Sequence, residues 1–168
     1  MSDLVQVTID GRTTMVPQDT TILQAATDLG IEIPTLCHHP ALEPYGACRL
    51  CTVEVIRDGW SRLVTACNYP IRQEIEILTA SETVVHGRRM IVELLWARCP
   101  DAEVFQQLGA QYGIDKPRFE PREGELCYLC GLCVRFCNAI VGARAISFTG
   151  RGVGREIGTP FYTISEAC

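Results

Sequence analysis

Cysteine is the residue type that most constrains this chain. There are ten cysteines among 168 residues, and eight of them fall into two groups of four. The first residues lack the charged-then-apolar layout of an export signal, so we expect a reducing, cytoplasmic location in which thiolates bind metal and disulfides are rare. The spacing within each group then indicates which metal chemistry to expect.

The first group has the spacing C-x10-C-x2-C-x15-C and consists of Cys37, Cys48, Cys51 and Cys67. An iron-sulfur cluster needs thiolates that converge on a compact cage, and a long irregular loop with one distant strand can deliver them. Small residues before the close pair, Gly46 and Ala47, would let backbone amides approach the sulfurs. Structural zinc sites usually pair two short knuckles, whereas this group contains one. The spacing therefore favours an iron-sulfur cluster over zinc.

The second group has the spacing C-x2-C-x2-C-x3-C and consists of Cys127, Cys130, Cys133 and Cys137. This is the run found in bacterial ferredoxins. Three thiolates with two residues between neighbours wrap a loop around one corner of a cubane, a geometry that suits a 4Fe-4S cluster better than a zinc ion or a redox dithiol. We therefore expect a 4Fe-4S cluster here.

The fourth ligand of this second cluster has two candidates. In two-cluster ferredoxins the fourth cysteine of such a run serves the other cluster, and a remote cysteine completes the first. Either the protein continues beyond Cys168 with another 4Fe-4S cluster that uses Cys137 and Cys168, or a single cluster takes one of these two residues as its fourth ligand. Cys127, Cys130 and Cys133 are ligands in both cases. A terminal thiol without a role is the plain alternative for Cys168.

Hydrophobic patterning predicts an α+β fold. Alternating segments beside Asp-Gly turns indicate strands, and a run with apolar residues on one helical face, residues 22–29, indicates a helix. The expected strands cover residues 4–9, 13–16, 52–56, 63–66 and 74–78. Residues 1–80 therefore predict a small mixed sheet with one packed helix, interrupted by an irregular loop over residues 33–50.

A helical connector is expected over residues 81–124, before the cysteine-rich segment 125–168. Ser81 is placed to cap a helix that runs to about Ala97, and a second helix follows from Asp101 to about Gln111. The first of these helices is expected to bury Val84, Met90, Ile91, Leu94 and Leu95. The most apolar stretch is much shorter than the roughly 20 residues that a spanning helix needs, so we expect no membrane span.

Two stretches around the first cysteine group resemble a known family. Residues 34–40, Pro-Thr-Leu-Cys-His-His-Pro, and residues 46–55, Gly-Ala-Cys-Arg-Leu-Cys-Thr-Val-Glu-Val, are similar to the 2Fe-2S domain that opens the large iron-sulfur subunit of complex I. Similar domains open iron-only hydrogenases and the diaphorase subunits of NAD-linked hydrogenases and formate dehydrogenases. The resemblance implies a β-grasp ferredoxin domain in which the four matching cysteines hold one 2Fe-2S cluster.

The resemblance extends to the second cysteine group and implies a ferredoxin-like 4Fe-4S segment there, on the flanks 131–136 and 145–148. In between, the family usually places a further 4Fe-4S centre at a His-Pro-x-x-Cys-x-x-Cys pattern. This chain has Cys99 at the histidine position and Ala102 at the first cysteine position. We therefore expect no cluster at this degenerate site. His38 and His39 are expected to be loop residues, since four cysteines already suffice.

These patterns together predict an electron-transfer subunit. The resemblance implies that it relays electrons through a 2Fe-2S and a 4Fe-4S cluster between an NADH-oxidising flavoprotein and a hydrogenase, formate dehydrogenase or similar reductase in a hetero-oligomer. No constellation of nucleophile, base and orienting group predicts catalysis by the chain alone. A net charge of −5 argues against nucleic acid as a partner. The alternatives are a zinc-stapled structural or interaction module and an iron-sulfur redox sensor.

Overall fold

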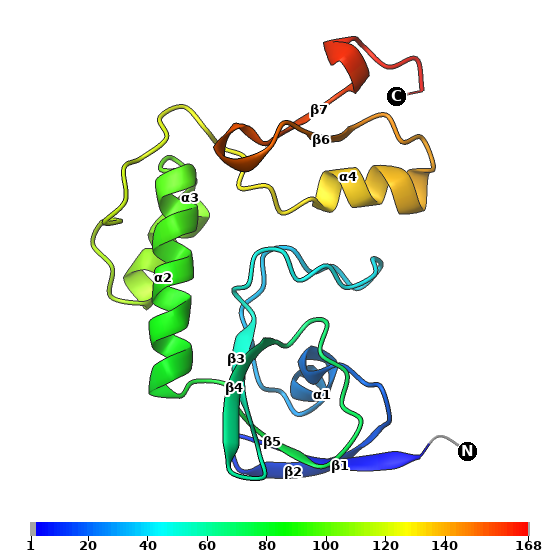
Figure 1. Ribbon diagram of the computed structural model, residues 1–168, viewed down its shortest axis with the longest axis vertical. Coiled ribbons are helices and arrows are strands. Elements are labelled where there is room, and N and C mark those ends of the chain that lie inside the picture. The colour runs from blue at the N-terminus through cyan, green and yellow to red at the C-terminus, as the bar shows by residue number, and fades with distance from the viewer. Residues whose placement is uncertain (1–2, 168) are drawn as a thin grey trace.

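A five-stranded sheet forms the lower half of the molecule in Figure 1, a computed structural model that describes residues 3–167. The strands lie in the order β2-β1-β5-β3-β4, with β1 and β5 parallel and the other neighbours antiparallel. They are β1 (Leu4–Ile9), β2 (Arg12–Pro17), β3 (Thr52–Arg57), β4 (Trp60–Thr65) and β5 (Ile75–Leu78). The mixed sheet predicted for the first 80 residues is confirmed.

Helix α1 (Ile22–Asp28) packs against this sheet. Thr21 caps the helix by accepting a hydrogen bond from the backbone amide of Gln24. Ile22, Ala25 and Ala26 are fully buried in a core that they share with the inward-facing residues of β1, β3 and β5. The predicted helix and its apolar face are therefore confirmed.

The two predicted hairpin turns are present, but one strand begins earlier than expected. Asp10-Gly11 and Asp58-Gly59 both have positive φ, as a type I′ turn requires. The predicted start of β4 at residue 63 was wrong, because the strand begins directly after the turn, at Trp60. Its first residues are exposed on the edge of the sheet, so the alternation that would reveal a half-buried strand is missing there.

Helix α2 (Glu82–Arg98) rises from the sheet toward the C-terminal segment, and α3 (Glu103–Gln111) packs beside it. Ser81 caps α2 as predicted, through the amide of Val84. The predicted buried side of α2 was partly wrong, since Leu94 is 50% exposed while Arg88 and Val92 are buried. Arg88 turns inward because its guanidinium binds the sheet, which sets the rotation of the helix.

The C-terminal segment forms the upper layer of the molecule (Figure 1). It contains the short helix α4 (Leu132–Phe136), a π-helical turn η1 (Cys137–Val141), and two 3₁₀ turns, η2 (Gly152–Gly154) and η3 (Pro160–Tyr162). Strands β6 (Ser147–Thr149) and β7 (Glu156–Gly158) pair antiparallel. Between this layer and the sheet runs the irregular loop that follows α1, as predicted.

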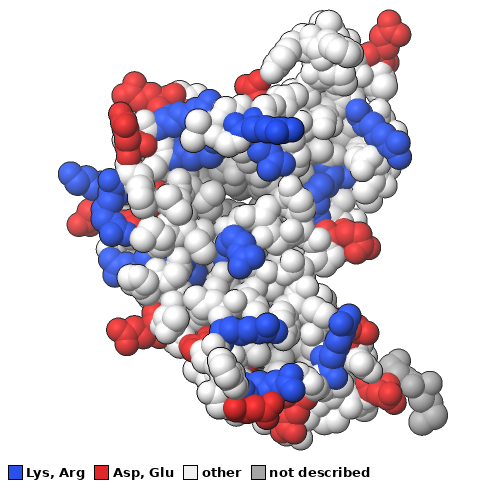
Figure 2. Space-filling view, in the orientation of Figure 1, with Lys and Arg blue, Asp and Glu red and all other residues white. Residues whose placement is uncertain are grey.

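Neither layer of the molecule carries only one sign of charge on the face shown in Figure 2. Figure 2 shows Lys and Arg over both halves of one face, interspersed with acidic and uncharged side chains. Within residues 3–167, no helix combines the length and the apolarity that crossing a membrane would require.

Two candidate metal centres

The irregular loop brings the first cysteine group together inside the protein. Cys37, Cys48, Cys51 and Cys67 are all buried. Gly46 has φ +69, and a Cβ at this position would lie 2.7 Å from the side-chain nitrogen of Asn68. The loop therefore approaches the turn that carries Cys67 at a place where the positive φ and the close side chain both favour glycine.

The four thiols lie as two pairs. The thiols of Cys37 and Cys48 share a hydrogen bond that lowers the pKa of Cys37 to about 5 and raises the pKa of Cys48. A hydrogen bond between the thiols of Cys51 and Cys67 likewise lowers the pKa of Cys51 to about 7 and raises that of Cys67. The charge of Cys37 acts on both members of the second pair, so the pairs adjoin.

This arrangement fits a binuclear cluster, in which each of two irons takes two protein ligands. Across residues 3–167, no three His, Cys, Asp or Glu side chains surround a single point as one metal ion would require. The two adjoining thiol pairs supply two ligands for each of two irons.

Backbone amides supply the polar surroundings that such a cluster needs. The amide of Cys48 donates to Sγ of Cys37 at 3.4 Å, and the amide of Ala47 also lowers the pKa of Cys37. Hydrogen bonds from amides to the sulfurs stabilise thiolates and help to set a cluster's potential. Nδ1 of His38, next to Cys37, is buried and has no hydrogen-bond partner among the described residues. This orphaned polar atom and the sulfur-directed amides fit a bound inorganic group.

The second cysteine group lies nearer the surface, around the start of α4. Cys127, Cys130 and Cys137 are partly buried and Cys133 is exposed. The amide of Ala145 donates to Sγ of Cys137 at 3.3 Å. All four residues lie on one short segment of backbone. The remaining candidate ligand, Cys168, lies outside the described residues, so the choice of fourth ligand stays a prediction.

Tyr128 connects the second group to the helices. Its ring packs edge-on against the fully buried Phe105 of α3, with 5.3 Å between the ring centroids. Burial is the main cause that raises the pKa of Tyr128 to about 12, with smaller contributions from Cys130, which also shares a hydrogen bond with its hydroxyl. The phenol therefore stays neutral beside the cysteine run.

The two cysteine groups meet in the folded protein. A second core, separate from the one under the sheet, consists of Cys37, Cys48, Leu50, Val92 and Ile114. Cys130 packs against this second core. A cysteine of the second group therefore lies against the residues that surround two cysteines of the first group.

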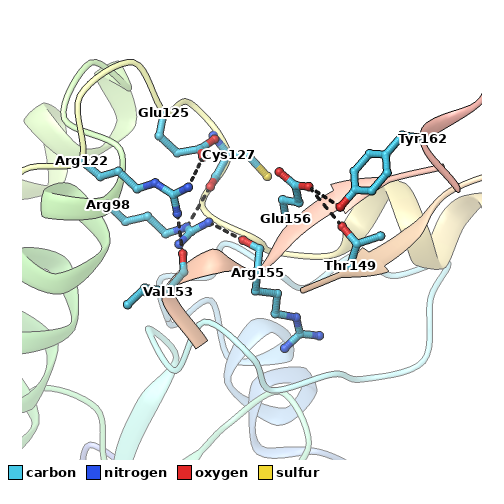
Figure 3. Close-up of polar contacts among 9 residues, drawn as sticks. All are labelled: Arg98, Arg122, Glu125, Cys127, Thr149, Val153, Arg155, Glu156 and Tyr162. Atoms are coloured by element: carbon cyan, nitrogen blue, oxygen red, sulfur yellow. Dashed lines mark hydrogen bonds and ion pairs between the residues drawn. The ribbon is translucent and has the colours of Figure 1, made fainter. Parts of the chain in front are cut away.

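Two arginine side chains bind the C-terminal segment, one from the end of α2 and one from the stretch that follows α3 (Figure 3). Arg98 donates to the carbonyl oxygens of Cys127, at 3.1 Å, and Arg155, at 2.9 Å. Arg122 donates to the carbonyl oxygen of Val153 at 2.6 Å. Sequence reasoning missed these roles, because a carbonyl acceptor carries no side-chain pattern.

The degenerate site holds a single buried thiol. Cys99 is fully buried, and this burial raises its pKa to about 11, so the thiol is neutral. His86 is exposed on α2. The expectation that no cluster forms at Cys99 stays a prediction.

Known proteins resemble this chain both in its first part and over most of its length. A family described as the 2Fe-2S iron-sulfur cluster binding domain matches residues 2–82. Over 93% of its length the chain is 37% identical to the NADPH-Fe(3+) oxidoreductase subunit alpha of Geobacter sulfurreducens. Over 92% it is 32% identical to the mitochondrial NADH-ubiquinone oxidoreductase 78 kDa subunit of Candida albicans. It covers 21% and 25% of these proteins, so it spans a quarter or less of the length of these curated relatives.

A solved structure resembles nearly the whole chain. It is a chain from the crystal structure of an NAD+-reducing [NiFe]-hydrogenase in the H2-reduced state, with a TM-score of 0.78 at 30% identity. The similarity covers 92% of this chain and 74% of that one. It therefore includes the helices and the C-terminal segment as well as the sheet.

Proposed function

This chain belongs to the iron-sulfur family shared by large subunits of complex I and an NAD+-reducing hydrogenase, and from that premise we propose that it is an electron-transfer subunit. It relays electrons between an NADH-oxidising flavoprotein and a hydrogenase, formate dehydrogenase or similar reductase, in a cytoplasmic hetero-oligomer. When bound, a 2Fe-2S and a 4Fe-4S cluster supply the one-electron chemistry. The residues of the chain bind the clusters, keep water away and tune their potentials.

The observation that carries this proposal is the contact between the two cysteine groups. Cys130 packs against the second core, which contains Cys37 and Cys48. A relay needs its two centres close together with protein and not water between them, and a structural zinc module has no such requirement. The buried position of Cys37 and Cys48 beside Cys130 supports the relay.

The thiol pairs support a ligand assignment. Cys37 and Cys48 would hold one iron of the 2Fe-2S cluster, and Cys51 and Cys67 the other, within a β-grasp domain over residues 1–80. Cys127, Cys130, Cys133 and Cys137 would hold the 4Fe-4S cluster within a ferredoxin-like segment over residues 125–168, with Cys168 as the alternative fourth ligand. Residues 81–124 connect the two.

Counting iron and acid-labile sulfide in anaerobically purified protein tests this proposal. One cluster of each kind requires about six irons per chain, visible absorption bleached by dithionite, and two distinguishable EPR signals after reduction. A colourless protein with stoichiometric zinc and no sulfide would contradict it. Loss of cluster on mild exposure to air, coupled to altered binding of a partner, would instead favour the redox sensor.

A further inference from the structure

Arg135 joins the two cysteine groups physically. It belongs to α4 and stands between Cys133 and Cys137 in the sequence. Its guanidinium donates to the carbonyl oxygen of Cys37 at 2.9 Å and also to the carbonyl oxygen of Glu43. A side chain from the middle of the second group is therefore bonded to the backbone of a cysteine in the first group.

A stack of aromatic and cationic side chains holds Arg135 in this position. The guanidinium carbon lies 5.0 Å from the ring centroid of Tyr45, and the Tyr45 ring stacks on Phe148 with 6.5 Å between centroids. The guanidinium carbon of Arg155 lies 4.0 Å from the ring centroid of Phe148. The stack joins the loop of the first group to the segment of the second, so it fixes both sides of the junction.

The contacts of Arg135 need the planar fork of a guanidinium. Two separate carbonyl oxygens accept from different nitrogens of the same group, while its face rests on the ring of Tyr45. A lysine ammonium has the charge but not the fork, so it cannot keep both bonds and the stacking in one geometry. The role of Arg135 therefore separates into a geometric part and an electrostatic part.

The charge of Arg135 also acts on the first group. Its guanidinium is held 2.9 Å from the carbonyl oxygen of Cys37, so the positive charge stands beside a proposed ligand of the 2Fe-2S cluster. A fixed positive charge stabilises the more negative, reduced form of a nearby redox group and so raises its potential.

We infer that Arg135 is a positioning residue that clamps the second cysteine segment onto the loop of the first and holds a fixed positive charge beside Cys37. This inference rests on the proposed function for its electrostatic part only. The clamp itself acts between protein groups, so it is testable whether or not the clusters are present.

Three variants of the full chain separate the two parts. Arg135→Met removes the charge and the fork, Arg135→Lys removes the fork only, and Arg151→Met is the control, since Arg151 is exposed in the same segment and makes no side-chain hydrogen bond with the described residues. Amide hydrogen exchange over residues 38–47 reports the clamp. The midpoint potential of the 2Fe-2S cluster reports the charge.

Exchange over residues 38–47 is expected to rise about tenfold or more in both Arg135 variants, because bonds from a charged donor are worth more than a decade in an equilibrium constant. The midpoint potential of the 2Fe-2S cluster should fall in Arg135→Met. In Arg135→Lys, which keeps the charge, it should lie close to the wild-type value. Arg151→Met should match the wild-type protein in both measurements. Wild-type exchange in both Arg135 variants would overturn the clamp, and a wild-type potential in Arg135→Met would overturn the electrostatic part.

Failure of this inference is distinguishable from failure of the proposed function. Wild-type protein without iron or sulfide would contradict the proposed function, and the exchange comparison would still decide the clamp. Wild-type protein with both clusters, together with unchanged exchange in the two Arg135 variants, would refute the clamp alone.

Discussion

Arg88 of α2 donates two hydrogen bonds, of 3.0 and 2.7 Å, to the carbonyl oxygen of Thr52 at the start of β3. Both residues are buried, and Thr52 directly follows Cys51. The helix that leads to the second cysteine group is therefore bonded to the backbone beside the first group.

Replacing Arg88 by Met should lower the free energy of unfolding by about 1–3 kcal/mol, because the buried carbonyl of Thr52 loses its charged donors while the aliphatic packing is kept. Urea denaturation measures the change. Arg89→Met is the control on the same helix. Arg89 is exposed and makes only one long, exposed hydrogen bond, of 3.3 Å to the carbonyl oxygen of Gly113, so its replacement should cost less than about 0.5 kcal/mol. Equal costs at the two positions would show that the buried bonds contribute little.

Two glycines in the helical connector should respond to alanine in opposite directions. A Cβ at Gly109 of α3 would collide with the indole of Trp96 and lie 3.0 Å from the carbonyl oxygen of Ile114, whereas a Cβ at Gly87 of α2 would meet only a methyl carbon of Leu63 at 3.7 Å. Gly109→Ala should therefore destabilise the protein by about 1–3 kcal/mol.

Gly87→Ala should stabilise it by about 0.5–1 kcal/mol, through the better helix propensity of alanine. Thermal unfolding of the two variants side by side checks both signs. A stabilised Gly109→Ala protein would mean that α3 does not pack on Trp96 as described.

Removing one buried thiol of the first group should remove one cluster. Cys51→Ala is expected to lose the 2Fe-2S EPR signal and to loosen the loop between Cys37 and Cys51, because cluster binding and folding are coupled. EPR and iron content of the variant measure this loss. A complete 2Fe-2S spectrum from Cys51→Ala would refute the ligand assignment.

Cys99→Ala is the matched control for that experiment, since Cys99 is equally buried but belongs to neither cysteine group. Both EPR signals should persist in this variant. Loss of either cluster would show that Cys99 is a ligand after all.

Acid should weaken the contact between α2 and the chain that follows α3. Arg118 donates to both carboxylate oxygens of Glu93, at 2.9 and 3.0 Å, and this hydrogen bonding lowers the pKa of Glu93 below its usual value of 4.5. A folded-state pKa below the unfolded one stabilises the protein above about pH 4.5, and this stabilisation is lost as the pH falls through the folded value.

Comparing wild-type protein with Glu93→Gln between pH 7 and pH 3 measures this contribution. The wild type should lose more unfolding free energy on acidification than the variant does. Glu120→Gln, at an exposed position, should follow the wild type. Parallel curves for wild type and Glu93→Gln would contradict the assigned pair.

The elements that the sequence predicted well are those with a local code. Asp10-Gly11 and Asp58-Gly59 specify their hairpins within a few residues, and the apolar run over residues 22–29 specifies α1. The parallel pairing of β1 with β5 was not predicted, because it joins strands more than 60 residues apart and depends on the whole sheet. The burial of Arg88 was not predicted for the same reason, because its hydrogen-bond acceptor is a backbone oxygen that is distant in sequence.

The candidate site divides in a similar way. Cysteine spacing alone selected the four thiols that the structure gathers into two pairs, because ligand chemistry restricts both residue type and distance along the chain. The sequence did not single out Arg135. Its position between Cys133 and Cys137 was the one sequence signal for its role, because a residue between two ligands has little freedom to point elsewhere.

The arginines that anchor the C-terminal segment bind main-chain oxygen. Arg98, Arg122 and Arg135 donate to carbonyls, whose chemistry is the same whatever residue carries them. The residues that carry these carbonyls can therefore be substituted over evolutionary time without compensating changes in the arginines, provided that the guanidinium and the path of the backbone persist. Methods that infer proximity from correlated substitutions would pass over these contacts, even though they join the two halves of the molecule.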